Sequence, residues 1–177
     1  MNWDYLQPVK IHFGKGRVKE IKEIARELGC ERGLLVAGPF FFKSGLAEKV
    51  IKESEGMIVA SFGDVAPTPD VAEVDACAEV IRQKNIGFVV ALGGGSPMDC
   101  AKCISIVSTN GGNILDYEGV DEIDLPGPPL ICIPSTAGTS ADVSQFAIVL
   151  DTEAHIKKAI ISKKVVPDLA LIDPIPL

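Results

Sequence analysis

Short apolar runs alternate with stretches of helical periodicity along this 177-residue chain. Most of the runs are continuous rather than alternating, which is typical of strands covered on both faces. They occupy residues 34–37, 57–60, 88–92, 130–133 and 169–172. Between them, residues 18–28 and 71–81 place their apolar side chains on one helical stripe. The alternation predicts an α/β domain with a mostly parallel sheet and right-handed crossovers.

Two regions depart from this alternation. Residues 108–129 contain Asn110-Gly111-Gly112-Asn113 and a proline-rich segment, and we expect a long surface loop there. Residues 144–162 hold two apolar runs separated by Asp151-Thr152-Glu153, which predicts a β-hairpin. The length fits one domain at about 150 residues per domain. Because the chain stops at Asp173-Pro174-Ile175-Pro176-Leu177, immediately after the last apolar run and with no closing helix, we expect residues 1–177 to be one domain cut at a domain boundary.

Charge and cysteine content exclude several classes of protein. The 17 basic and 24 acidic residues give a formal net charge of −7, which argues against nucleic acid or an anionic membrane as partner. The apolar runs are too short to span a bilayer, and the N-terminus lacks the features of a signal peptide. The odd number of cysteines, five, favours reduced thiols in the cytoplasm over a disulfide framework.

A glycine-rich turn, Gly93-Gly94-Gly95-Ser96, carries the strongest local signal. It follows an apolar run and precedes a helical stretch, with Ser96 expected as N-cap, Pro97 at the first helical position and Asp99 as capping-box acid. Glycines and a helix N-terminus together let a phosphate group approach the backbone. The alternative is a plain strand–turn–helix junction. The turn matches neither the Gly-x-Gly-x-x-Gly pattern nor a Walker loop.

A second polar segment follows the apolar run at 130–133. Residues 134–142 contain four hydroxyl side chains and two small spacers, able to hydrogen-bond ribose, phosphate or carboxamide groups. An ordinary capped turn is the alternative for this segment alone. Both segments lie at the carboxyl ends of predicted strands, where open α/β sheets bind ligands. Their joint occurrence is stronger evidence for a ligand site at this edge than either segment alone.

Other chemistry-bearing residues are weaker candidates. Cys100-x-x-Cys103 has the spacing of a redox pair or of half a zinc site, but it stands alone inside an apolar helical stretch. We therefore expect both thiols to be buried. His12 in an early strand and His155 beside a turn are far apart in the sequence, so we expect structural or solvated roles for them.

Residues 92–102 and 134–139 together resemble the iron-containing alcohol dehydrogenases of the dehydroquinate synthase-like superfamily. Residues 13–16, 39–45 and 166–174 are similar as well, so the resemblance covers the whole chain. It implies a Rossmann-like N-terminal dinucleotide-binding domain and, in full-length members, a C-terminal helical domain that holds the metal. The intact enzyme would be an NAD(P)-dependent alcohol dehydrogenase, or aldehyde or ketone reductase, and we expect the isolated chain to be inactive.

The resemblance also implies a metal, a substrate class and an oligomeric state for the intact enzyme. The family binds iron or zinc through one Asp and three His, all downstream of the segment similar to 166–174, so no catalytic or metal-ligating residue is assigned in this chain. We expect a small alcohol or aldehyde as substrate, and a homo-oligomer for the intact enzyme. A glycerol dehydrogenase or an anaerobic aldehyde reductase is an alternative within the superfamily. A stand-alone nucleotide-binding module without catalysis is the alternative from another class.

The resemblance assigns cofactor-binding roles residue by residue. Those expected to meet the pyrophosphate and the nicotinamide side are Gly94, Gly95, Ser96 and Asp99. Those expected to line the adenosine and phosphate path are Ser135, Thr136 and Thr139. Lys157 would reach the nicotinamide ribose, and its neighbour Lys158 would be a solvated charge.

Three positions depart from the family pattern. Thr68 replaces the Asn of a Pro-Asn-Pro turn, and Ser140-Ala141-Asp142 stands in place of Gly-Ser-Glu. Gly38 stands where NAD-selective members carry an Asp that binds the adenosine ribose hydroxyls and repels a 2′-phosphate. Lys43 could add a positive charge nearby. We therefore expect NADP to be tolerated and somewhat favoured over NAD.

Overall fold

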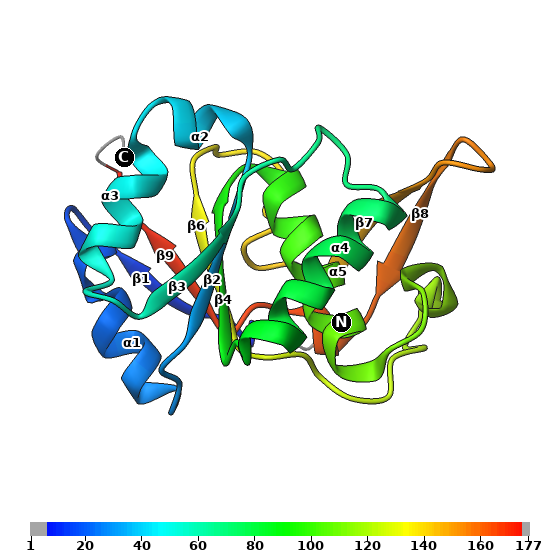
Figure 1. The fold of residues 1–177 in the computed structure, drawn as a ribbon, viewed down its shortest axis with the longest axis horizontal. Helices are drawn as coiled ribbons and strands as arrows, with labels where there is room; N and C mark the ends of the chain where they lie inside the picture. The colour runs from blue at the N-terminus through cyan, green and yellow to red at the C-terminus, as the bar shows by residue number, and fades with distance from the viewer. Residues whose placement is uncertain (1–6, 175–177) are drawn as a thin grey trace, which may run out of the picture.

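The computed structural model describes residues 7–174 and contains a six-stranded parallel sheet (Figure 1). Its strands are ordered β1-β9-β6-β4-β2-β3. Their bounds are β1 Lys10–Phe13, β9 Leu169–Ile172, β6 Leu130–Pro134, β4 Phe88–Gly93, β2 Gly33–Ala37 and β3 Ile58–Phe62. The predicted α/β class and all five predicted strands are confirmed. Residues 1–5, on which the signal-peptide expectation rests, and the chain end at Leu177 lie outside the described residues.

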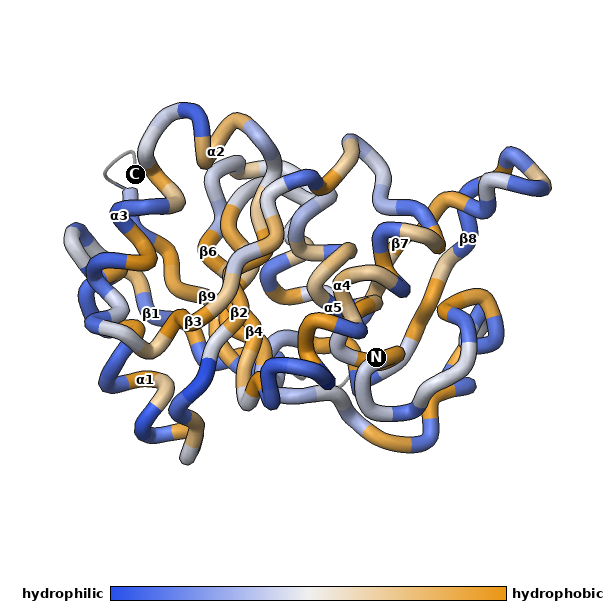
Figure 2. The backbone as a smooth tube through the Cα atoms, viewed as in Figure 1, coloured by the Kyte–Doolittle hydropathy of each residue, from blue (hydrophilic) through white to orange (hydrophobic). Residues whose placement is uncertain are grey.

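Two hydrophobic cores lie on opposite faces of this sheet. Along β2, Leu34 and Val36 pack into one core, whereas Leu35 and Ala37 pack into the other. Side chains alternate between faces along a strand, so a strand buried on both faces must be apolar throughout. Figure 2 shows this concentration of hydrophobic residues in the central strands.

Helices cover both faces (Figure 1). One face is covered by the 3-10 helix η1 (Arg17–Glu20) with α1 (Ile21–Glu27), α2 (Pro39–Lys43) and α3 (Leu46–Glu53). The other is covered by α4 (Val71–Lys84) and α5 (Gly95–Asn110). Helix α4 begins at a capping box in which Asp70 Oδ1 accepts from the Glu73 N–H at 2.8 Å. Within residues 7–174, no helix is both long and apolar enough to cross a bilayer.

A smaller sheet stands beside α4 and α5, in the order β5-β8-β7. Strands β7 (Phe146–Asp151) and β8 (Ile156–Ile161) pair antiparallel and form the predicted hairpin, which extends away from the main sheet (Figure 1). Strand β5 (Gly119–Val120) pairs with β8.

The expectation of a long loop over residues 108–129 is wrong in part. Helix α5 continues to Asn110, and the 3-10 helix η2 (Ile114–Tyr117) and β5 follow. Asn113 and Asp116 form a capping box that starts η2, so the polar residues are caps of short elements. The 3-10 helix η3 (Lys163–Val165) lies between β8 and β9 and completes the last connection to the main sheet.

Candidate functional site

The two polar segments meet at the carboxyl end of the parallel sheet, where β4 and β6 lie side by side. The Ser135 N–H donates to the Gly93 carbonyl oxygen at 2.9 Å. A Cβ added to Gly94 would lie 3.3 Å from Thr136 Oγ1, and one added to Gly95 would lie 3.1 Å from Thr139 Cγ2. The glycine turn and the hydroxyl loop (residues 135–145) are therefore in contact, and larger residues would force them apart.

The start of helix α5 differs from the expected one. Gly94 is the N-cap and Gly95 the first helical residue, so Ser96 and Pro97 occupy the second and third positions. Gly93 has a φ of 141°, which favours glycine, and turns the chain before Ser96 is reached. The Ser96 hydroxyl donates to the Pro67 carbonyl oxygen at 2.5 Å, and Asp99 forms no capping box. The predicted helix is confirmed, but the predicted cap is wrong.

This helix start still leaves backbone donors for an anion. The first N–H groups of a helix lack intrahelical partners, and here no side chain caps them. Pro97 has no N–H, so the groups of Gly94, Gly95 and Ser96 are the donors nearest the turn. Their position between β4 and the hydroxyl loop is a suitable site for a phosphate group.

A cavity of about 740 Å³ opens beside the hydroxyl loop. Its polar wall includes Ser135, Thr136 and Asp142, and its apolar wall comes from α2 and α3. Phe40 at this wall is 66% exposed and packs edge-on against Phe41, with ring centroids 5.4 Å apart. Pockets of about 300–1,000 Å³ with apolar walls and a few polar groups are typical of small-molecule and cofactor sites.

Gly38 lies between β2 and this apolar wall. It is the N-cap of α2, with extended backbone at φ −79° and ψ 164°. A Cβ added there would have the Val65 carbonyl oxygen, 3.9 Å away, as its nearest neighbour. A side chain at this position would therefore fit without strain, and the glycine leaves the space open.

Asp99 lies on the face of α5 that packs against β7. Its carboxylate accepts a hydrogen bond from the Ile148 N–H. Burial raises the pKa of this carboxyl to about 6, although Lys102 and the Ile148 hydrogen bond lower it. The structure thus ties Asp99 to the edge strand of the smaller sheet, a contact that the sequence did not predict.

Lys157 is exposed on β8, opposite Leu150, and does not belong to the described lining of the cavity. Its neighbour Lys158, expected as a solvated charge, forms an ion pair with Glu118 at 2.8 Å. The structure therefore does not bring Lys157 together with the glycine turn and the hydroxyl loop.

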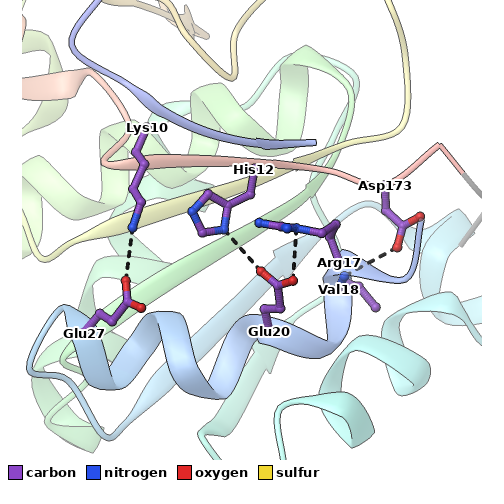
Figure 3. A network of polar contacts seen from close by, with 7 residues as sticks. All are labelled: Lys10, His12, Arg17, Val18, Glu20, Glu27 and Asp173. Atoms are coloured by element: carbon purple, nitrogen blue, oxygen red, sulfur yellow. Dashed lines mark hydrogen bonds and ion pairs between the residues drawn. The ribbon is translucent and has the colours of Figure 1, made fainter. Parts of the chain in front are cut away.

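A polar network ties the first strand to the cavity rim (Figure 3). The Asp173 carboxylate, which lines the cavity, accepts from the Val18 N–H at 3.4 Å. Glu20 contacts His12 Nδ1 at 3.3 Å and Arg17 Nε at 3.0 Å. His12 thus lies in β1, as expected, with a carboxylate as its partner.

The described residues do not fit a metal ion. Across residues 7–174, no group of three or more His, Cys, Asp or Glu side chains is arranged to hold one. Cys100 and Cys103 are buried, as expected, and burial raises the pKa of both thiols. Neutral buried thiols are poor metal ligands, since the thiolate is the ligand.

Comparison with known proteins places these features in one family. The family model described as iron-containing alcohol dehydrogenase matches residues 8–174. Alcohol dehydrogenase 4 of Schizosaccharomyces pombe is 41% identical over 164 residues, which are 92% of this chain and 39% of that protein. The NAD-dependent methanol dehydrogenase of Bacillus methanolicus is 34% identical over 172 residues, 96% of this chain and 45% of that protein.

Solved structures agree with this placement. Sulfoacetaldehyde reductase from Bifidobacterium kashiwanohense, solved in complex with NAD+, superposes with a TM-score of 0.93 at 42% identity. The match covers 98% of this chain and 46% of that one. The chain thus spans less than half the length of these relatives.

Proposed function

The chain belongs to the iron-containing alcohol dehydrogenase family, and we propose that residues 1–177 form the dinucleotide-binding domain of an NAD(P)-dependent alcohol dehydrogenase or aldehyde or ketone reductase. The observation that carries this proposal is the contact between the glycine turn and the hydroxyl loop, with Gly95 against Thr139. The glycine turn offers exposed backbone N–H groups, the hydroxyl loop offers side-chain hydroxyls, and the two meet beside a cavity. This arrangement suits a pyrophosphate flanked by two nucleosides.

In this proposal the N–H groups of Gly95 and Ser96 bind the pyrophosphate, where the helix N-terminus stabilises negative charge. The hydroxyls of Ser135, Thr136 and Thr139 hydrogen-bond the adjoining sugar and phosphate oxygens. The exposed ring of Phe40 and the apolar wall offer a surface for adenine. The bound nicotinamide would accept or donate the hydride, and the residues of this chain bind and orient it.

The substrate and the remaining machinery are proposed at the level of chemical class. The relatives are named as dehydrogenases or reductases of small alcohols and aldehydes, which supports such a substrate here. The metal expected for the family would need ligands other than those of residues 7–174. We also propose a cytoplasmic homo-oligomer for the intact enzyme, with Asp99 and Lys157 on its nicotinamide side.

For the choice of cofactor, we propose that NADP is accepted and favoured over NAD. The support is Gly38, which offers no carboxylate to bind ribose hydroxyls or repel a 2′-phosphate and leaves open space. The NAD+ in the sulfoacetaldehyde reductase complex belongs to that protein.

Titration of the chain with NADH and NADPH, followed by nicotinamide fluorescence at matched ionic strength, tests the proposal. We expect saturable binding of both, competed by ADP-ribose, with the tighter binding for NADPH. Absence of binding for both dinucleotides would refute the proposed site, and NADH binding at least tenfold tighter than NADPH would refute the cofactor preference.

A further inference from the structure

Strand β7 forms one edge of the smaller sheet, and three of its outward backbone groups are hydrogen-bonded to other elements. Edge strands present a row of N–H and C=O groups that need partners when buried. The Leu150 N–H donates to the Pro69 carbonyl oxygen at 2.8 Å, and the Ile148 N–H donates to Asp99. The Phe146 carbonyl oxygen accepts from Lys102 Nζ at 2.8 Å.

Lys102 is the most deeply buried charged residue in this contact, with only 1% of its surface exposed. Its ammonium donates to the Ser144 carbonyl oxygen at 2.9 Å, to Ser144 Oγ at 3.1 Å and to the Phe146 carbonyl oxygen. An ammonium has three donors, so every one has an acceptor. All the acceptors belong to one short segment, where the hydroxyl loop enters β7.

The opposite end of the hydroxyl loop is held by the glycine turn. The Ser135 N–H donates to Gly93, and Thr139 lies against Gly95. Between these ends, Ser140 adopts a positive φ of 54°, which fixes a tight turn. The loop that carries the proposed cofactor contacts is thus bound at both ends.

One face of helix α5 makes both attachments. Gly95, Asp99 and Lys102 are four and then three residues apart, a spacing that places them on one helical stripe. Along this stripe Gly95 contacts the hydroxyl loop, and Asp99 accepts the hydrogen bond from the Ile148 N–H. Lys102 donates to Ser144, at the end of the loop. The distance between the helix N-terminus and the hydroxyl loop is therefore set by this stripe.

We propose that Lys102 is a positioning residue, whose three hydrogen bonds fix the hydroxyl loop so that Thr136 and Thr139 close against the glycine turn. It touches no cofactor and acts through the loop. The inference rests on the proposed function for its consequence, tighter dinucleotide binding, but not for the loop geometry itself.

Lys102→Met removes the ammonium and keeps an unbranched apolar side chain that extends to the position of the lysine Cε. Lys164→Met is the matched control, because Lys164 Nζ donates to the Ile123 carbonyl oxygen at 2.6 Å, in a different loop. We expect NADH to bind Lys102→Met at least tenfold more weakly than wild type, measured well below the unfolding temperature of each variant. The Lys164→Met control should bind within twofold of wild type even if it is less stable.

Hydrogen exchange of the ligand-free chains separates this inference from the proposed function. Lys102→Met should speed the exchange of amides in residues 135–145, and Lys164→Met should not. If Lys102→Met does not fold, Ser144→Ala, which removes one acceptor and no charge, should still speed exchange in the same residues and weaken NADH about two- to fourfold.

Unchanged exchange in residues 135–145 of the folded variants overturns the positioning role, whatever the wild type binds. NADH binding by Lys102→Met within twofold of a wild type that does bind overturns it as well. A wild type that binds no dinucleotide, with faster loop exchange in Lys102→Met, refutes the proposed function and leaves the positioning of the loop established.

Discussion

Adding one methyl group at Gly95 tests the proposed phosphate site directly. In Gly95→Ala the new Cβ would lie 3.1 Å from Thr139 Cγ2 and 3.3 Å from Thr139 Oγ1. Carbon contacts are optimal at about 3.5–4.0 Å, so Thr139 must move by about half an ångström. Overpacking of this kind costs about 1–3 kcal/mol, while replacing a helical glycine by alanine returns about 0.5–1 kcal/mol. The chain should therefore stay folded.

The effect on binding should be larger than the effect on folding. The Cβ would stand where a phosphate oxygen approaches the Gly95 N–H, and a hydrogen bond to a charged group is worth about 1.5–3 kcal/mol. At about 1.4 kcal/mol for each factor of ten, NADH should bind Gly95→Ala roughly ten- to a hundredfold more weakly. Gly95→Val, with a branched side chain, should abolish detectable binding while the fold survives.

Fluorescence titration with NADH and urea unfolding of the same samples give the two quantities. Gly87→Ala is the matched control, because a Cβ at Gly87 would meet no atom closer than 3.8 Å. Gly87 also precedes β4, so it lies at the opposite end of this strand from the glycine turn. It should leave the dissociation constant within twofold of wild type. If Gly95→Val binds NADH or NADPH as well as wild type, the assignment of the turn to phosphate is wrong.

Other positions give independent tests. Gly38→Asp should weaken NADPH at least tenfold relative to NADH in paired titrations, because a carboxylate would face the 2′-phosphate, and an unchanged ratio would count against the reading of Gly38. The pKa of Asp99 is raised from 3.8 to about 6, so the folded chain binds this proton more tightly than the unfolded chain does. The stability of the fold therefore falls as the pH rises through that window. Lys102 is the charged group that faces this carboxyl. Asp99→Asn cannot titrate, so its unfolding free energy relative to wild type should rise by about 1–3 kcal/mol between pH 4 and 7.5 in urea titrations; a difference that ignores pH would contradict this. Cys30 is the cysteine that is only partly buried, so a thiol reagent should modify about one thiol in the native chain and all five in urea, and fast reaction of a second native thiol would contradict the burial.

The central strands β2, β4, β6 and β9 could be predicted because burial on both faces leaves a continuous apolar signature. Helix α2 could not, since its three consecutive phenylalanines give no helical period, and the structure divides them between two environments: Phe40 and Phe41 line the cavity, whereas Phe41 and Phe42 pack against the core. The sequence also predicts a start for α5 at Pro97, two residues later than the observed start at Gly95. Hydroxyl residues favour N-caps in general, but the backbone at Gly93 had already turned the chain, which left the Ser96 hydroxyl free to bind Pro67.

The site was predictable to the level of which loops meet, because the carboxyl ends of adjacent parallel strands share one edge of a sheet. The position of Lys157 was not, since a hairpin's placement depends on the surface against which it packs. Nor could the place of Lys43 be predicted: from the sequence we expect it to add a positive charge near Gly38 from a loop, whereas it belongs to the last turn of the short helix α2.

Asp99 and Lys102 look in sequence like a surface pair three residues apart on a helix, which would be worth a few tenths of a kcal/mol. The burial of the neighbouring residues shows that this pair does not lie on a solvated surface. Residues on every side of this helix, including Met98, Ala101 and Ile104, are at most 1% exposed, so α5 has little solvated face over these turns. A charged group on a helix buried all round must find partners within the protein, because an uncompensated buried charge is very costly. The apolar flanks of Lys102 are therefore a sequence signal for an internal hydrogen-bonding role, and the structure identifies the entrance to β7 as its partner.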